Sequence, residues 1–312
     1  MKMSMKIQSF GGRVGWITRK IAPALAGMLF TTIMFKLRRK RTLRFINDFF
    51  SSSQQPKPLI VGIETINRCN GTCSFCPSNI NDEIRPYKKM SEALFLSIVE
   101  QLVDWGYSGR VMMCANNEPF LDTRITEWTR HIRERLPDAN IYVITNGTLL
   151  TVDNFREIAP FMDEIQINNY SDKMRLHDNI REIVQYVRKN PEEFKHLVID
   201  IQYRYNNEVL SNRNGNAPNK LVNSNSKIVH EPCFEPFVSM TIYPDGIIGI
   251  CCFDAVEKSN LGDCNINTLE EIWNSDTMNS LRHLMRKDRS EYEFCKYCDG
   301  FSKVIRTKLT QQ

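Results

Sequence analysis

The sequence lacks a hydrophobic run long enough to cross a membrane. The segment Ile21–Phe35 (IAPALAGMLFTTIMF) is uncharged, but it has only fifteen residues and lies between basic clusters. A helix of this length extends about 22 Å at ~1.5 Å per residue, whereas a hydrocarbon core is ~30 Å thick. No small-residue cleavage site follows it, which argues against a secretory signal. The favoured interpretation is a helix in a membrane interface, with residues 13–44 in peripheral contact with anionic lipids. A helix packed on the body is the alternative, and a true span is disfavoured.

The sequence also lacks a distributed basic face and a disulfide framework. Its net charge of +5 comes from the first 44 residues, notably KLRRKRTLR at 36–44, and the remainder has no excess of basic residues. Binding to nucleic acid therefore has no support. The ten cysteines do not follow the spacing of a small secreted scaffold, and a chain of 312 residues can bury a core without them. Clustered cysteines in such a chain indicate metal ligands and a reducing compartment, so we expect a cytoplasmic protein.

After Pro58, short apolar runs alternate with amphipathic segments. Strands are predicted at 59–64, 110–114, 141–145, 164–168 and 197–203. Helices are predicted at 91–105, 124–136, 153–158 and 179–189. Such alternation implies right-handed βαβ units around a parallel sheet. Because five strands are visible and a sixth is not clearly placed, we predict an α/β fold with a partial (β/α)6 TIM-like barrel.

The C-terminal part has a different pattern. Residues 206–225 contain eight asparagines and no apolar period, which is typical of a loop and marks a domain boundary. FVSMTIYPDGIIGICCFD predicts a β-hairpin that turns at Pro244. NTLEEIWNSDTMNSLRHLMRK predicts a helix with Thr268 as N-cap and Glu271 as its capping-box partner. We therefore predict four parts: a basic and apolar extension (1–58), the α/β core (59–205), an Asn-rich linker (206–231) and a small hairpin–helix domain (232–312).

Three cysteines in NRCNGTCSFCP indicate the site of the chemistry. Cys69, Cys73 and Cys76 follow the first predicted strand and precede a helix, at the edge where α/β folds place their active sites. Soft thiolates suit an iron–sulfur cluster or zinc. Three thiolates leave one iron of a [4Fe–4S] cube open, and an open metal position can bind a substrate or cofactor. A zinc site that recruits a fourth ligand such as His131 is the alternative.

These residues resemble the signature of the radical S-adenosylmethionine (SAM) superfamily. Its C-x3-C-x2-C loop has an aromatic residue, here Phe75, before the third cysteine. NNEP at 116–119 resembles the family's GGEP motif, and ITNGTLL at 144–150 is a form common in it. The resemblance covers residues 59–205, and its three elements fall after three successive strands. It departs from the family where Asn116 and Asn117 replace two glycines.

The resemblance implies both the cofactors and the reaction. Cys69, Cys73 and Cys76 would hold a [4Fe–4S] cluster whose open iron binds the amino and carboxylate groups of SAM. One electron, from a donor such as flavodoxin or ferredoxin, would cleave SAM to a 5′-deoxyadenosyl radical that abstracts a substrate hydrogen. Contacts to the cofactor are expected from Phe75, Asn116, Asn117, Glu118, Pro119, Asn146, Asn168 and Arg204.

Candidate contacts with substrate follow the later strands. Asn168 and Asn169 close the fourth strand and are placed to face the ribose or the substrate. Arg204 lies just past the fifth strand, with Glu208 and Arg213 shortly after it. A guanidinium fork holds hydroxyls or carboxylates well, and the alternative is that these are solvated loop charges.

The C-terminal cysteines resemble a second iron–sulfur module. Cys233-x12-Gly246-x4-Cys251 and Cys295-x2-Cys298 are similar to the opening and middle of a SPASM domain. Only fourteen residues follow Cys298, so the arrangement resembles the shortened form called a twitch domain. This form implies one auxiliary [4Fe–4S] cluster with four thiolate ligands, Cys233, Cys251, Cys295 and Cys298. A zinc ribbon with the same ligands is the alternative.

Three cysteines stay outside this assignment. Neighbouring side chains of a strand face opposite sides, and the G-x4-C spacing favours Cys251 over Cys252. Cys114 is expected to be a small buried hydrophobe. Cys264 is expected to be a plain loop cysteine, and the alternative is that it or Cys252 replaces one of the four ligands.

An auxiliary cluster without an open iron is suited to electron transfer. We therefore expect a radical SAM oxidoreductase that oxidises a small polar molecule such as a sugar or cyclitol. The main alternative is a maturase that modifies a peptide or protein partner, although the first 58 residues show no strand-rich module for a leader peptide. Radical epimerisation or dehydration and a non-enzymatic iron–sulfur scaffold are the remaining alternatives.

Overall fold

The structure is a computed structural model that describes residues 5–9, 40–41, 43–52, 55–79, 85–208, 210–220 and 227–300. The predicted interface helix at 21–35 lies outside these residues. Within the described ranges, no helix has the length and apolar character needed to cross a membrane.

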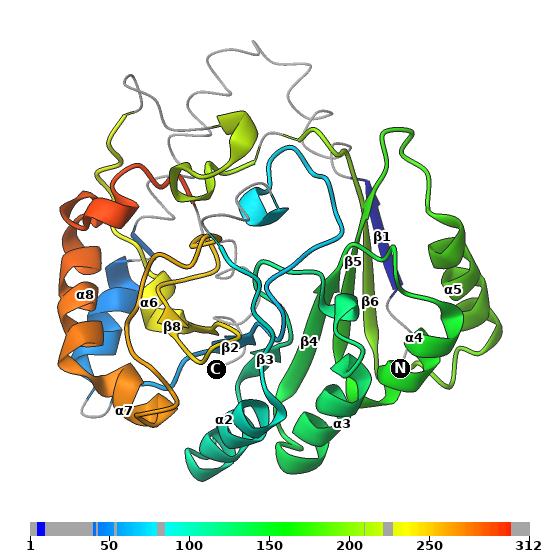
Figure 1. Cartoon of the computed structure of the whole chain (residues 1–312), viewed down its shortest axis with the longest axis horizontal. Coiled ribbons are helices and arrows are strands. Elements are labelled where there is room, and N and C mark those ends of the chain that lie inside the picture. Colours follow the sequence, from blue (N-terminus) through cyan, green and yellow to red (C-terminus); the bar gives the residue numbers. More distant parts are fainter. Residues whose placement is uncertain are drawn as a thin grey trace.

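One curved sheet organises the molecule (Figure 1). Its eight strands have the order β1-β6-β5-β4-β3-β2-β7-β8, and every neighbouring pair is parallel except β7 and β8. The strands are β1 (Met5–Ser9), β2 (Ile60–Ile63), β3 (Arg110–Met112), β4 (Asn140–Thr145), β5 (Glu164–Tyr170), β6 (Val198–Arg204), β7 (Ser239–Ile242) and β8 (Ile248–Gly249). The five predicted strands are thus confirmed as β2 to β6. The sixth parallel strand of the core is β1, which the sequence analysis did not place.

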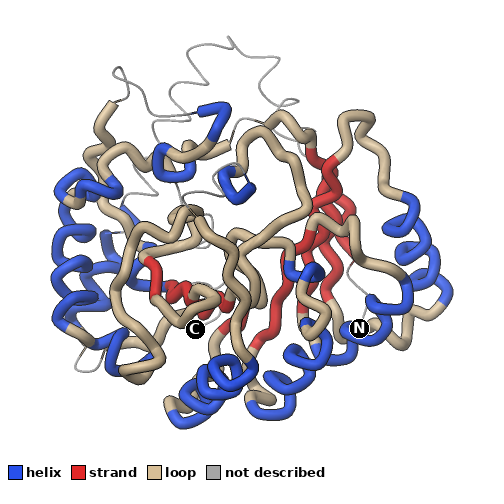
Figure 2. Tube along the Cα trace, viewed as in Figure 1, coloured by secondary structure: helices blue, strands red, loops and turns tan. Residues whose placement is uncertain are grey.

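Helices cover the outer side of the parallel strands (Figures 1 and 2). They are α2 (Glu92–Asp104), α3 (Ile125–Arg135), α4 (Val152–Ile158) and α5 (Asp178–Lys189), each within two residues of its prediction. Their apolar faces carry fully buried residues such as Phe95, Ile132 and Ile180. Their N-termini are capped by Ser91 in α2 and by a Thr151–Asn154 capping box in α4.

The C-terminal hairpin extends the sheet of the core. The hairpin β7–β8 forms as predicted, and β7 also pairs in parallel with β2 along Ile60–Ile63. The helices of this part are α6 (Glu235–Val238), α7 (Leu269–Asn274) and α8 (Asp276–Lys287). The described residues also include short 3-10 helices: η1 (Pro77–Asn79), η2 (Pro119–Leu121), η3 (Ala159–Phe161), η4 (Arg213–Gly215), η5 (Pro218–Lys220), η6 (Arg289–Glu291) and η7 (Glu293–Cys295).

The single helix predicted after the hairpin is wrong in one respect, because the chain breaks it into α7 and α8. The Thr268–Glu271 capping box that begins α7 is confirmed. Ser275, however, has extended backbone angles (φ −64°, ψ 157°), and its side chain accepts a hydrogen bond from Met278 N. A serine at this place caps a new helix more readily than it continues the old one.

Five loops meet at the carboxyl edge of the sheet. They follow β2, β3, β4, β5 and β6, and the first three contain the cysteine loop, NNEP and ITNG. In parallel α/β folds this edge carries the binding site, because all strands end there. The sequence motifs are therefore brought together by the topology.

Candidate active site

The thiols of the cysteine loop face a common space. Gly71 N lies 3.3 Å from Cys69 Sγ, and a Cβ added at Gly71 would lie 3.3 Å from Cys69 Sγ and 3.8 Å from Cys73 Sγ. Burial raises the pKa of Cys69 to about 11 and that of Cys73 to about 12. The neighbouring thiols add to both rises, while Arg204 opposes the rise at Cys73. A bound cation would offset this electrostatic cost and hold the ligands as thiolates.

The soft thiol donors of this loop suit an iron–sulfur cluster. Among the described residues, no group of three or more His, Cys, Asp or Glu side chains converges to hold one metal ion. The irons of a cube take one thiolate each, so three cysteines leave one iron for another ligand. His131 lies on α3 in a surface cavity lined also by Glu92 and Glu127, so it is not brought to the cysteines. The zinc alternative with His131 as fourth ligand is therefore wrong.

Glu118 ties the NNEP motif to the ITNG motif. Its carboxylate accepts hydrogen bonds from Thr145 Oγ1 and Asn146 N, both at 2.7 Å. Glu118 N also donates to Arg68 O at 2.9 Å, which connects the cysteine loop. Asn146 Nδ2 donates to Asn70 Oδ1 at 2.8 Å and lies 3.8 Å from Cys69 Sγ. Burial raises the pKa of Glu118, and these hydrogen bonds oppose the rise.

The two asparagines that replace glycines offer free donors. Asn116 Nδ2 and Asn117 Nδ2 are buried and, within the part of the chain that the structure describes, have no hydrogen-bond partner. A buried donor without an acceptor is costly, so each of these Nδ2 groups is suited to donate a hydrogen bond to a bound carboxylate or hydroxyl oxygen. Pro119, which follows, is buried at the start of η2. The NNEP loop thus fits an acceptor-rich ligand such as the amino-acid end of SAM.

The side chains of Phe75, Tyr170 and Arg204 lie together beside the cysteine loop. The buried ring of Phe75 lies 5.7 Å from that of Tyr170. The guanidinium of Arg204 lies 5.6 Å from the Tyr170 ring and forms an ion pair with Glu208 at 2.5 Å. Arg204 is therefore an oriented, partly neutralised cation near the thiols.

The two asparagines at the end of β5 differ in role. Asn168 is 9% exposed, and its Oδ1 accepts a hydrogen bond from Gln166 Nε2 at 3.1 Å. Asn169 is fully buried; its Nδ2 donates to Arg175 O and its Oδ1 accepts from His177 N, both at 2.9 Å. The expectation that Asn169 faces a ligand is wrong, because its amide fixes the turn after β5.

Arg213 bridges the core and the C-terminal part. Its Nη1 lies 3.4 Å from Asn116 Oδ1 and 3.2 Å from Cys252 O, and its guanidinium lies 5.7 Å from the Phe253 ring. No carboxylate of the described residues forms an ion pair with it. Arg213 and Asn214 both have positive φ (46° and 60°), which non-glycine residues rarely adopt. Such strain is typical of positions held for function.

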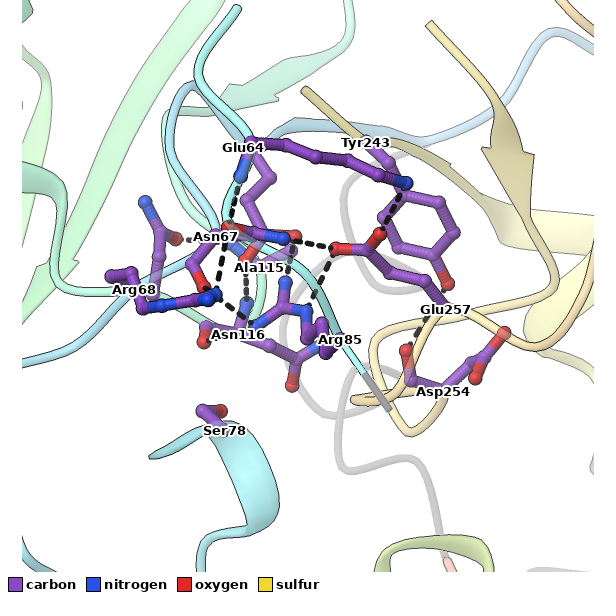
Figure 3. A network of polar contacts seen from close by, with 12 residues as sticks. Glu64, Asn67, Arg68, Ser78, Arg85, Ala115, Asn116, Tyr243, Asp254 and Glu257 are labelled. Carbon is purple, nitrogen blue, oxygen red and sulfur yellow. Dashed lines mark hydrogen bonds and ion pairs between the residues drawn. The ribbon is translucent and has the colours of Figure 1, made fainter. Parts of the chain in front are cut away.

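A buried ion network also joins the two parts. Arg85 lies between two carboxylates: Nη2 is 2.6 Å from Glu64 Oε2, and Nε is 2.7 Å from Glu257 Oε1 (Figure 3). All three side chains are at most 5% exposed. Lys88 Nζ adds a third contact, 2.8 Å from Glu257 Oε2. Glu64 Oε1 accepts from Asn116 N at 3.1 Å, so the network reaches the NNEP loop.

The pKa shifts of the network follow from burial and from Arg85. Burial raises the pKa of Glu64, and Arg85 opposes that rise. At Glu257 burial also acts to raise the pKa, but Arg85 and Lys88 outweigh it, so the pKa is lowered. Glu257 has φ +54°, and the network holds it in that unfavourable conformation.

Four of the C-terminal cysteines line one cavity. Four thiols are in its wall, those of Cys233, Cys251, Cys295 and Cys298. Burial raises the pKa of all four, to about 12 at Cys233. Cys252 is not part of the wall, and Cys264 lies beside the hairpin turn, 3.2 Å from a Cβ built at Gly246. Cys114, two residues after β3, is 3% exposed.

Sequence reasoning missed two groups of this site. Arg85 and Glu257 meet across 172 residues, and Glu64 joins them. Only the acidic residue Glu64, directly after a buried strand, hinted at this group. Glu235 and Arg289 line the cavity of the four cysteines, and no local pattern marks either.

Comparisons with known proteins agree with these two sites. The radical SAM superfamily model matches residues 63–202, and the model of the SPASM iron–sulfur cluster-binding domain matches residues 233–299. A curated relative from Niallia circulans is 23% identical over 246 residues, which are 78% of this chain and 93% of the relative. It is named S-adenosyl-L-methionine-dependent 2-deoxy-scyllo-inosamine dehydrogenase.

Solved structures share the fold. BtrN in complex with AdoMet and 2-DOIA is 22% identical, with a TM-score of 0.67 over 80% of this chain and 96% of BtrN. An open conformation of BtrN is 19% identical, with a TM-score of 0.58 over 79% and 94%. The AdoMet-bound anSMEcpe is 14% identical, with a TM-score of 0.50 over 78% and 85%. The likeness to BtrN confirms the predicted partial barrel.

Proposed function

Since the chain belongs to the radical SAM superfamily and carries a SPASM-type iron–sulfur domain, we propose that it oxidises an alcohol carbon of a small polar molecule such as a cyclitol or sugar. Its cofactors are [4Fe–4S] clusters and SAM. The observation that carries the proposal is the position of Arg213, a guanidinium without a carboxylate partner among the described residues. It contacts both the NNEP loop and the loop of the auxiliary cysteines.

The residues for the cofactors follow from the site. Cys69, Cys73 and Cys76 would hold the SAM-binding cluster, and the Nδ2 groups of Asn116 and Asn117 would donate to the carboxylate of SAM. Bound there, the cluster and SAM supply a 5′-deoxyadenosyl radical when one electron arrives from a donor such as flavodoxin or ferredoxin. The chain's own part is to orient the substrate and to exclude water.

The net reaction needs a second electron acceptor. The alcohol becomes a carbonyl in three losses. Its carbon loses a hydrogen atom, its hydroxyl group loses a proton, and the resulting radical loses one further electron. The proton leaves to solvent. The remaining electron requires an acceptor close to the substrate, and the cavity lined by four thiols supports a closed auxiliary cluster in that place.

A small substrate is favoured over a peptide. The relative from Niallia circulans is named for a cyclitol amine, and this chain covers 93% of its length. Arg204 ends β6 and Arg213 contacts Asn116 of the NNEP loop, and guanidinium groups at such positions are suited to bind the hydroxyl groups of a small polar molecule.

The test is a label-transfer assay under anaerobic conditions. 2-Deoxy-scyllo-inosamine, deuterated at its hydroxyl-bearing carbons, is the probe. We expect one deuterium in 5′-deoxyadenosine for each carbonyl formed. The contrary result has two parts: SAM is cleaved but 5′-deoxyadenosine gains no deuterium from this or any other polyol, and it does gain deuterium from a labelled peptide. That result would assign the chain to peptide modification instead.

Replacing Arg213 should weaken substrate binding. A hydrogen bond from a charged donor contributes about 1.5–3 kcal/mol, so we expect Arg213→Ala to raise KM about tenfold or more. Arg181→Ala, which removes an exposed guanidinium on α5, is the matched control and should leave KM unchanged. An unchanged KM in Arg213→Ala would show that Arg213 does not contact the substrate.

The N-terminal extension carries a separate proposal. Its basic clusters around Ile21–Phe35 are suited to a membrane interface with anionic lipids. We expect partial sedimentation of the protein with anionic vesicles in low salt and its release in high salt. A protein that stays wholly in the supernatant at low salt would contradict this contact.

A further inference from the structure

A buried arginine lies in the wall of the cavity that contains the four cysteines. Arg289 begins η6 and is only 4% exposed. It lines the cavity together with Cys233, Cys295 and Cys298. The guanidinium group stays protonated in proteins, so this wall carries a permanent positive charge.

The hydrogen bonds of Arg289 fix its position without neutralising it. Nε donates to Glu231 O at 3.2 Å, and Nη2 donates to Pro232 O at 2.9 Å. Nη1 donates to Cys298 O at 3.1 Å and to Gly300 O at 2.9 Å. All four acceptors are neutral backbone carbonyls, and no carboxylate of the described residues forms an ion pair with it. A buried charge without a counter-ion is unfavourable, so the cavity is suited to an anion.

The other charged group of the wall has the opposite sign. Glu235 is 7% exposed, and its carboxylate accepts a hydrogen bond from Ser239 Oγ at 3.0 Å. Burial raises the pKa of Cys233, Cys295 and Cys298, and Arg289 opposes the rise at all three. Glu235 adds to the rise at Cys233. The two side chains therefore act on the thiols in opposite directions.

We propose that Arg289 is the counter-cation of the auxiliary cluster and that its charge favours the reduced cluster. A cube with four thiolate ligands is a dianion in its resting state and gains one negative charge when it accepts one electron. A fixed cation stabilises the more negative state more strongly. In the proposed reaction the electron would come from the substrate radical, whose hydroxyl proton would leave to solvent, so charge and atoms balance. The inference rests on the proposed function only in requiring a cluster in this cavity.

The test is a redox titration followed by electron paramagnetic resonance. It uses the full chain with Cys69, Cys73 and Cys76 replaced by alanine, so that only the auxiliary cluster contributes. Arg289→Gln should lower the equilibrium constant for electron acceptance about tenfold or more, and tenfold corresponds to ~59 mV for one electron. Arg289→Lys, which keeps the charge, should stay close to the parent. Glu235→Gln should shift the potential in the opposite direction, to a more positive value.

Each outcome decides the role of Arg289. An Arg289→Gln variant that carries a full auxiliary cluster and has the reduction potential of the parent would overturn this role. If Arg289→Gln holds no iron, the iron content of Arg289→Lys decides. A cluster retained in Arg289→Lys would support the role of the charge. Loss of the cluster in Arg289→Lys as well would show that only the hydrogen-bonding fork of arginine matters. A parent without iron would contradict the auxiliary cluster and this role together. A loaded parent with unchanged potentials leaves the proposed function intact.

Discussion

Replacing Cys69, Cys73 and Cys76 together with alanine should abolish the formation of 5′-deoxyadenosine. The three thiols are the only ligands that the cysteine loop offers to a cluster, and without them SAM has no iron to bind. Chromatography of an anaerobic reaction with a strong reductant measures the product directly. We expect the variant to form none above background and to retain about four irons per chain in the second cluster.

The matched control for this variant is Cys264→Ala. Cys264 is buried beside the hairpin turn, and it is not in the cavity lined by Cys233, Cys251, Cys295 and Cys298. Its replacement should leave 5′-deoxyadenosine formation and iron content unchanged. Continued SAM cleavage by the triple variant would contradict the assignment of the cysteine loop.

Arg85→Met should cause the largest loss of stability among single substitutions in the ion network. It leaves the buried carboxylates of Glu64 and Glu257 without their shared cation, and breaking a buried pair in this way costs about 3–5 kcal/mol. Anaerobic urea denaturation measures the free energy of unfolding. Because the network joins the NNEP loop to the C-terminal part, we also expect weaker binding of SAM.

Two further variants separate the network from general effects of the substitution. Arg135→Met removes an exposed partner of Glu100 and should leave the free energy of unfolding within experimental error. Glu64→Gln in the Arg85→Met background removes one unpaired buried charge and should recover part of the loss. Equal stability of Arg85→Met and Arg135→Met would show that the network does not stabilise the fold.

The sequence analysis correctly predicted the helices and strands that carry a local residue pattern. The five strands β2 to β6 and helices α2 to α5 carry periodic apolar residues, and the Thr268–Glu271 capping box marked the start of α7. The parallel pairing of β7 with β2 joins segments about 180 residues apart and has no local signal. The break at Ser275 was missed because the apolar period continues across it.

The residues of the candidate site likewise fall into those with a local sequence signal and those without one. The cysteine loop, NNEP and ITNG were recognised as motifs, because each is a short run with a fixed spacing. Arg85, Glu257 and Arg289 act through contacts with distant segments, and charged residues of this kind look like ordinary surface residues in a sequence. Asn169 shows the reverse error, since a polar residue at a strand end proved to fix a turn.

The central claim is that the chain carries two cubane clusters, one of them short of one protein ligand. Anaerobic analysis of iron and acid-labile sulfide in the reconstituted protein tests it most directly. We expect about eight irons and about eight sulfides per chain, with no stoichiometric zinc. A colourless protein that holds zinc, or one that holds no more than about four irons after full reconstitution, would contradict it.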